Sequence, residues 1–117
     1  MLATEHIETA RHFLAEADRE YESGDMLQAS EKLWGAASHV VIAEMHRRGM
    51  KSSRHRAMTL AVQEFAADGE DLGLSDMFAG ARAMHANFYH GFMEDYEFEI
   101  DREKVHRFVN RMLELSE

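Results

Sequence analysis

The stretch DMLQASEKLWGAASHVVIAEMHRR, residues 25–48, decides the fold of this chain. Apolar residues cover much of the circumference of the helix that it would form. Asp25 can cap that helix, with Gln28 three residues later as in a capping box. We expect one helix from Met26 to Arg48, about 35 Å long at a rise of about 1.5 Å per residue. A helix that is apolar on so many sides must be covered by other helices, so it should be the central element, with Trp34 buried in the core.

Four further segments have the apolar periodicity of amphipathic helices, and we predict no strand. Their expected starts are Thr4 as N-cap, Ser52 or Ser53 as N-cap, Ser75, and the residue after Asp101. The expected helix ends lie at Ser23-Gly24, Gly49 and Asp68-Gly69. The helix expected to start at Ser75 carries Met77, Ala81, Met84, Phe88 and Phe92 on one face. The sequence therefore predicts an all-α fold, an antiparallel up-and-down bundle of about five helices, in a single domain over residues 1–117.

The composition is that of a globular chain rather than a disordered one, with 45% hydrophobic and 30% charged residues among 117. There is no Cys, which excludes disulfide bonds, thiolate metal sites and a Cys nucleophile. The N-terminal residues lack the basic and apolar regions of a secretion signal, and no apolar run has the length of a membrane span. We therefore expect a cytoplasmic protein without a membrane partner.

The formal net charge of −9 opposes general attraction to phosphate backbones, yet five of the 13 Lys and Arg residues lie close together. They are Arg47, Arg48, Lys51, Arg54 and Arg56. The third helix should begin at this cluster, and the backbone N–H groups of a helix N-terminus bind anions. Ser53, Arg54 and His55 are therefore candidates for holding a phosphate. The alternative is that the Ser residues cap the helix and that the charges are solvated.

The fourth predicted helix carries a second group of polar residues. Arg82, His85 and Tyr89 fall at positions i, i+3 and i+7 and line one stripe, while Asn87 and His90 lie on a neighbouring one. If the five helices alternate in direction, the C-terminal end of this helix returns to the basic cluster. Arg can orient a phosphate and a neutral His can accept the proton of a 2′-hydroxyl, which is the chemistry of metal-free RNA cleavage. The alternative is a hydrogen-bonded group at a helix–helix or subunit seam.

Metal binding has one partial signature in the sequence. Glu103 and His106 stand three residues apart, which places two potential ligands on one helix face as in di-iron bundles. Such a site needs a second copy of this pair and a Glu from each of two other helices, and the second copy is missing. We therefore predict neither a metal ion nor another cofactor.

The segments QASEKLWGAA, residues 28–37, and HANFY, residues 85–89, resemble the PaREP-type branch of the HEPN (higher eukaryotes and prokaryotes nucleotide-binding) superfamily. The resemblance implies an α-helical bundle that commonly dimerises and is often encoded beside a nucleotidyltransferase partner. It also implies that some members are metal-free ribonucleases, whose motif is Arg, four to six residues, then His. Here His85 follows Arg82 too closely and His90 too distantly, and a predicted loop separates Arg48 from His55.

Two functions of different classes fit these residues. The first is a HEPN-like nucleotide- or RNA-binding module, either a degenerate metal-free ribonuclease or the partner of a nucleotidyltransferase. Its ligand-binding candidates are Arg47, Arg48, Lys51, Ser53, Arg54, His55, Asn87 and Tyr89, and its catalytic candidates are Arg82, His85 and His90. The second is a non-enzymatic interaction protein that forms homo-oligomers, with a dimer as the first expectation. We expect this because the helices carry 9 Met and 7 Phe, and their apolar surface would then exceed what one small bundle can bury.

Overall fold

The structure, a computed structural model, describes residues 2–51 and 54–115. These residues form five helices and no strand: α1 (Ala3–Ser23), α2 (Met26–Arg47), α3 (His55–Asp68), α4 (Leu74–His90) and α5 (Asp95–Leu115). The helices pack against one another in an all-α bundle, which confirms the fold class predicted from the sequence. Over the described residues, none of these helices is both long and apolar enough to cross a bilayer.

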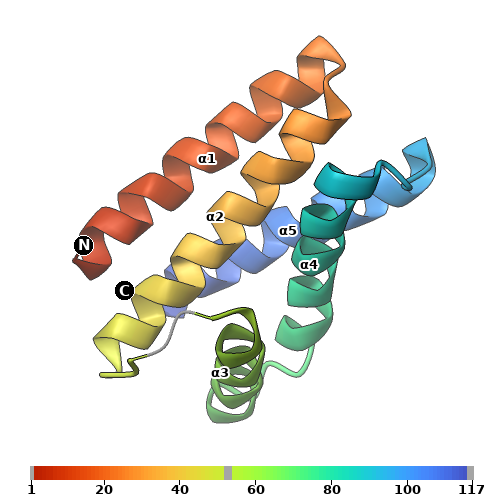
Figure 1. The fold of residues 1–117 in the computed structure, drawn as a ribbon. Coiled ribbons are helices and arrows are strands. Elements are labelled where there is room, and N and C mark those ends of the chain that lie inside the picture. Colours follow the sequence, from red (N-terminus) through yellow and green to blue (C-terminus); the bar gives the residue numbers. More distant parts are fainter. Residues whose placement is uncertain (1, 52–53, 116–117) are drawn as a thin grey trace.

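α2 is the central helix, and each of the other four contacts it (Figure 1). α1 lies antiparallel along one side of α2, while α4 and α5 cover other sides. α4 is antiparallel to α2, because Asn87 near its end hydrogen-bonds to Ser30 near the start of α2. α5 is antiparallel to α1, because Phe98 near its start stacks on Tyr21 near the end of α1. These four helices alternate in direction, whereas the sequence analysis expected all five to alternate, which would have placed α4 parallel to α2 and α5 parallel to α1.

α3 does not take part in this alternation. It lies crosswise to the bundle, so Figure 1 shows it nearly end-on. The chain therefore enters α4 at the end of the bundle where it left α2, and α4 carries it away from that end. Gly91, after the last turn of α4, lies beside Leu27 at the start of α2. The expected return of this end of α4 to the basic cluster is thus wrong, because α3 is a short crossing helix rather than one that runs the length of the bundle.

The ends of α2 agree with the sequence analysis. The carboxylate of Asp25 accepts a hydrogen bond of 3.0 Å from the backbone N–H of Gln28, which confirms the predicted cap. The helix ends at Arg47, one residue before the predicted Arg48, and Gly49 follows with a φ of +75°. This left-handed conformation favours Gly and turns the chain out of the helix.

The predicted starts of α1 and α3 differ from the observed ones. α1 begins at Ala3, so Thr4 lies inside the helix rather than capping it. The carboxylate of Glu5 accepts a hydrogen bond from the backbone N–H of Leu2 instead. The residue before α3 is Arg54, whose side chain makes no capping hydrogen bond. Ser52 and Ser53 lie outside the described residues.

α5 begins at Asp95, well before the predicted start after Asp101. Glu97 caps it, since its Oε1 accepts a hydrogen bond of 3.0 Å from the backbone N–H of Glu94. Carboxylates are favoured in the first turn by the positive end of the helix dipole. α4 starts at Leu74, next to the predicted Ser75, but it ends at His90. Phe92 therefore lies beyond α4 and is 51% exposed instead of extending its apolar face.

The core lies between α2 and the helices around it. Trp34 is 7% exposed, which confirms its predicted burial, and its ring centroid lies 5.9 Å from that of Phe78 on α4. Phe78 in turn contacts Phe108 on α5, with centroids 5.2 Å apart. Gly35 permits a close approach of α1, because a Cβ at this position would come within 2.9 Å of the Phe13 ring. Aromatic contacts thus run from α2 through α4 to α5.

We predict that Trp34→Ala lowers the free energy of unfolding by about 3–5 kcal/mol, because the truncation removes a large buried side chain and leaves a cavity. Thermal and urea unfolding measure the loss. The control is Leu72→Ala, which shortens a side chain that is 84% exposed and should change stability by less than about 0.5 kcal/mol. A Trp34→Ala protein that melts with the wild type would contradict this assignment of the helix faces.

Candidate functional site

Arg47 and Arg48, the first residues of the basic cluster, form ion pairs within the protein. Both form ion pairs with Glu44, whose side chain is 2% exposed. Arg48 Nη1 also binds the Asp68 carboxylate at 2.8 Å, and its guanidinium lies over the Phe65 ring. Burial of Glu44 disfavours its charge, but hydrogen bonds from both arginines outweigh burial and lower its pKa. These two candidates therefore balance a buried carboxylate and join the end of α2 to the end of α3.

The remaining candidates of the basic cluster lie around the start of α3. Lys51 and Arg54 are exposed, and Ser53 lies outside the described residues. His55 is the first residue of α3, and its ring lies against two other rings. Its centroid is 5.0 Å from that of Trp34 and 4.9 Å from that of His85. The crossing of α3 thus brings His55 to the middle of α2 and α4.

Four rings from three helices form what we call the ring cluster: Trp34 of α2, His55 of α3, and His85 and Tyr89 of α4. The rings of Trp34 and His85 are 4.8 Å apart, and Tyr89 meets His85 edge-on at 5.4 Å. Trp34 is the buried base of the cluster, whereas Tyr89 is 66% exposed. The ring cluster therefore connects the core to the surface and presents an aromatic ring there.

Arg82 and His85 supply polar groups at the ring cluster. Arg82 is exposed one turn before His85, and its Nη1 donates a hydrogen bond of 3.4 Å to Thr59 Oγ1 of α3. Burial lowers the pKa of His85 below the usual 6.5, the neighbouring His55 lowers it further, and Glu31 opposes both. His85 is therefore neutral at about pH 7, and one of its ring nitrogens can accept a proton.

Asn87 and His90 lie apart from this arrangement. Asn87 is 3% exposed; its Nδ2 donates to Ser30 Oγ at 3.0 Å, and its Oδ1 accepts from the backbone N–H of Met93 at 2.9 Å. Both bonds are internal and join α4 to α2 and to the connection before α5. His90 is exposed in the last turn of α4, at the end of the bundle opposite to the basic cluster.

Comparison with known protein families assigns the chain to one of them. Residues 5–109 match the archaeal PaREP1/PaREP8 family. The chain belongs to this family. The matched residues begin in α1 and end in α5, so they include every member of the ring cluster. Comparisons with curated proteins and with solved structures gave no significant match.

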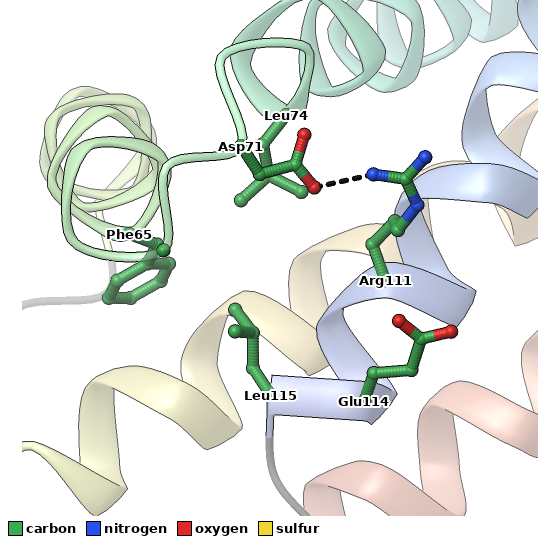
Figure 2. A pocket seen from close by; sticks show the side chains of 7 residues that line it. Phe65, Asp71, Leu74, Arg111, Glu114 and Leu115 are labelled. Carbon is green, nitrogen blue, oxygen red and sulfur yellow. Dashed lines mark hydrogen bonds and ion pairs between the residues drawn. The ribbon is translucent and has the colours of Figure 1, made fainter.

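A pocket of about 290 Å³ lies near the end of α5 in this PaREP1/PaREP8 chain (Figure 2). Phe65, Leu74 and Leu115 give it apolar walls, and an ion pair of 2.6 Å between Arg111 and Asp71 lies along its edge. The guanidinium that an anion would need there is already paired with Asp71. None of the sequence-derived candidates that the structure describes lines this pocket.

The two residues of the partial metal signature have different surroundings. Glu103 is exposed, and His106 Nε2 lies 2.9 Å from Asp18 Oδ1 of α1. Across the residues that the structure describes, no three His, Asp or Glu side chains are grouped as metal ligands. His106 instead helps to hold α5 against α1.

Three histidines at the seam between α1 and α2 form a group that the sequence analysis did not single out. The Nδ1 atoms of His6 and His39 are 2.8 Å apart, and the ring of His46 meets that of His6 edge-on. Only one of the two Nδ1 atoms can carry the proton of this hydrogen bond, so double protonation breaks it. His39 and His46 are seven residues apart on one face of α2, and only the register of α1 places His6 between them.

We predict that the stability of this PaREP1/PaREP8 chain falls as the pH drops from about 7 to about 5.5. Burial lowers the pKa of His6 and His39 below the usual 6.5, and His39 and His46 lower that of His6 further. The unfolded chain therefore takes up protons first. The stabilisation by the neutral pair is complete above about pH 6.5 and is lost below it.

Melting temperatures measured across this pH range check the prediction. The variant His6→Gln/His39→Gln should have a flatter pH dependence than the wild type. A wild-type melting temperature that stays constant or rises toward pH 5.5 would show that the pair does not control stability.

Proposed function

We propose that this PaREP1/PaREP8 protein is a HEPN-like cytoplasmic module that binds a nucleotide or RNA at the ring cluster. The observation that carries the proposal is the position of Tyr89, which is 66% exposed and is backed by His85 and the buried Trp34. Exposed rings anchored in a core are platforms for nucleobases, and stacking contributes about 1–3 kcal/mol per base. A flat ligand can therefore rest on Tyr89 without any rearrangement of the core.

Local charge supports an anionic ligand at the same place. The whole chain is acidic, with a net charge of −9, so general attraction to nucleic acid is weak. At the ring cluster, however, exposed Arg82 lies one turn from His85, and exposed Arg56 follows His55 in the first turn of α3. The N-terminal end of α3 adds the positive end of a helix dipole. When the base of a nucleotide stacks on Tyr89, the phosphate of that nucleotide would lie in this region of positive potential.

Binding is the activity that these residues support better than cleavage. A neutral His85 beside Arg82 has groups of the right chemistry for attack by a 2′-hydroxyl. The spacing from Arg82 to His85 is nevertheless shorter than in the ribonuclease motif that the resemblance implies. We therefore propose a degenerate ribonuclease site that retains ligand binding, and a nucleotidyltransferase as its protein partner.

Titration with AMP and with a single-stranded RNA of eight nucleotides tests the proposal. We predict that Tyr89→Ala weakens binding by about 5- to 100-fold, as expected when one stacking ring is lost. The matched control is Tyr96→Ala, because Tyr96 is 68% exposed on α5 and is not part of the ring cluster. Arg82→Gln should also lower the salt dependence of RNA binding, whereas Arg107→Gln on α5 should not. Equal affinities of Tyr89→Ala and the wild type would exclude the ring cluster as the site.

A homo-oligomeric interaction protein is the second candidate, and a separate set of residues favours it. Large apolar side chains are exposed at the start of α2, in the α4–α5 connection and in the first turns of α5. They are Leu27, Phe92, Tyr96 and Ile100, between 44% and 68% exposed. Apolar residues gathered at one end of a small bundle are typical of protein–protein contact surfaces.

We predict that the chain forms a dimer at micromolar concentration through this apolar end. Sedimentation velocity measures the state of the wild type. Phe92→Glu/Ile100→Glu should shift it to a monomer, because two charges would be buried in the contact. Leu72→Glu, a change at the exposed α3–α4 connection, should leave the dimer intact. A wild-type monomer at these concentrations would rule out self-association.

A further inference from the structure

Two buried polar atoms at the ring cluster lack a hydrogen-bond partner among the described residues, namely Oε2 of Glu31 and Nδ1 of His85. Glu31 lies on α2, about one turn before Trp34. The His85 ring lies 4.8 Å from the Trp34 ring, on the facing side of α4. An unsatisfied buried polar group is destabilising, so native structures leave few of them. Two such atoms in one seam call for a common explanation.

The chemistry of the two atoms is complementary. A carboxylate oxygen only accepts hydrogen bonds, whereas Nδ1 of a neutral imidazole donates in one tautomer and accepts in the other. With the proton on Nδ1, His85 is the donor that Glu31 lacks, and one hydrogen bond satisfies both atoms. With the proton on Nε2, two acceptors face the same seam and both remain unsatisfied. The buried environment therefore favours the tautomer in which Nδ1 carries the proton.

We propose that Glu31 is a positioning residue for His85, accepting a hydrogen bond from Nδ1–H so that the lone pair on Nε2 is presented to the ligand. The two atoms are not hydrogen-bonded in the structure, so joining them requires a rotation of the Glu31 side chain, whose charge already acts on His85. Nε2 has no hydrogen-bond partner among the described residues and is not one of the enclosed atoms, so solvent or a ligand can reach it. The carboxylate thus fixes both the tautomer and the orientation of the ring.

The groups around His85 limit it to the neutral form. His55 of α3 lies 4.9 Å from its ring, Tyr89 lies at 5.4 Å, and Arg82 is one turn away on the same helix. Glu31 alone favours a second proton, while burial and His55 oppose it and keep the pKa of His85 below its usual value. At about pH 7 the outer nitrogen is therefore an acceptor.

This acceptor narrows the class of ligand, a step that rests on the proposed function. Nε2 pairs with a hydrogen-bond donor, such as a sugar hydroxyl or the exocyclic amino group of a base. The phosphodiester oxygens of RNA have no proton to offer at neutral pH, and the phosphate of AMP is largely ionised, so the phosphate group of these ligands is a poor partner for this atom. Selection by His85 should thus act on the nucleoside part of a ligand, and Arg82 on its phosphate.

The tautomer of His85 can be measured in the full chain without a ligand, by long-range ¹H–¹⁵N correlation spectra of ¹⁵N-histidine-labelled protein. At pH 7.5 we expect a protonated Nδ1 and an unprotonated Nε2 in the wild type. Glu31→Gln, which keeps the shape of the side chain, should lower the pKa of His85 further because the opposing negative charge is lost. Glu64→Gln, an exposed change on α3, should leave the pKa of His85 and its tautomer unchanged. A wild-type spectrum with the proton on Nε2, or an unchanged pKa in Glu31→Gln, overturns the proposal.

AMP titrations then separate this inference from the proposed function. Glu31→Gln should weaken AMP binding by about tenfold, the equivalent of one hydrogen bond. In the background of His85→Ala the same change should have no effect, because Glu31 acts through His85. If AMP and RNA fail to bind the wild type, the proposed function fails, while the spectra still decide whether Glu31 positions His85. If AMP binds the wild type and Glu31→Gln equally well, Glu31 has no part in recognition.

Discussion

The burial of α2 on nearly all sides is the constraint from which the arrangement of the other helices follows. A long helix with apolar residues around most of its circumference is stable in water only when neighbours cover it, since each Å² of apolar surface removed from water contributes roughly 25 cal/mol. Small residues let those neighbours come close, as Gly35 does for Phe13 of α1. Large residues fill the wider gaps, as Trp34 does between α2 and α4.

Buried polar groups then fix how each end of the bundle is closed. At one end, the buried Glu44 needs both Arg47 and Arg48, and Arg48 reaches Asp68 and so holds the end of α3. At the other end, Asn87 joins Ser30 to the start of the α4–α5 connection. Because each of these groups would be costly to leave unpaired, they favour this arrangement over other ways of packing the same apolar faces.

The features that the sequence analysis predicted correctly are those with a local cause. The periodicity of α2 and the cap at Asp25 can be read from adjacent residues, and so can the stripe that carries Arg82, His85 and Tyr89. The start of α5 was missed because residues 95–100, DYEFEI, alternate acidic and apolar side chains and therefore lack the apolar period of a helix. The direction of α3 has no local signal at all, since a crossing helix and an alternating one have the same amphipathic pattern.

The candidate site depends on the crossing direction of α3, which was the hardest feature to predict. His85 and Tyr89 were identified from their stripe, but Trp34 was assigned to the core and His55 to a phosphate site, and only the crossing of α3 brings the four rings together. The charge count was misleading for a related reason: it did not reveal that Arg47 and Arg48 are committed to Glu44.

A site shared by α3 and α4 also has an energetic consequence. A ligand that touches Tyr89 and His55 together contacts both helices, and it therefore stabilises the docked position of α3 by the free energy of its own binding. Since α3 packs mainly on α2 and α4, its position is the part of this fold that a ligand at the ring cluster would control most directly.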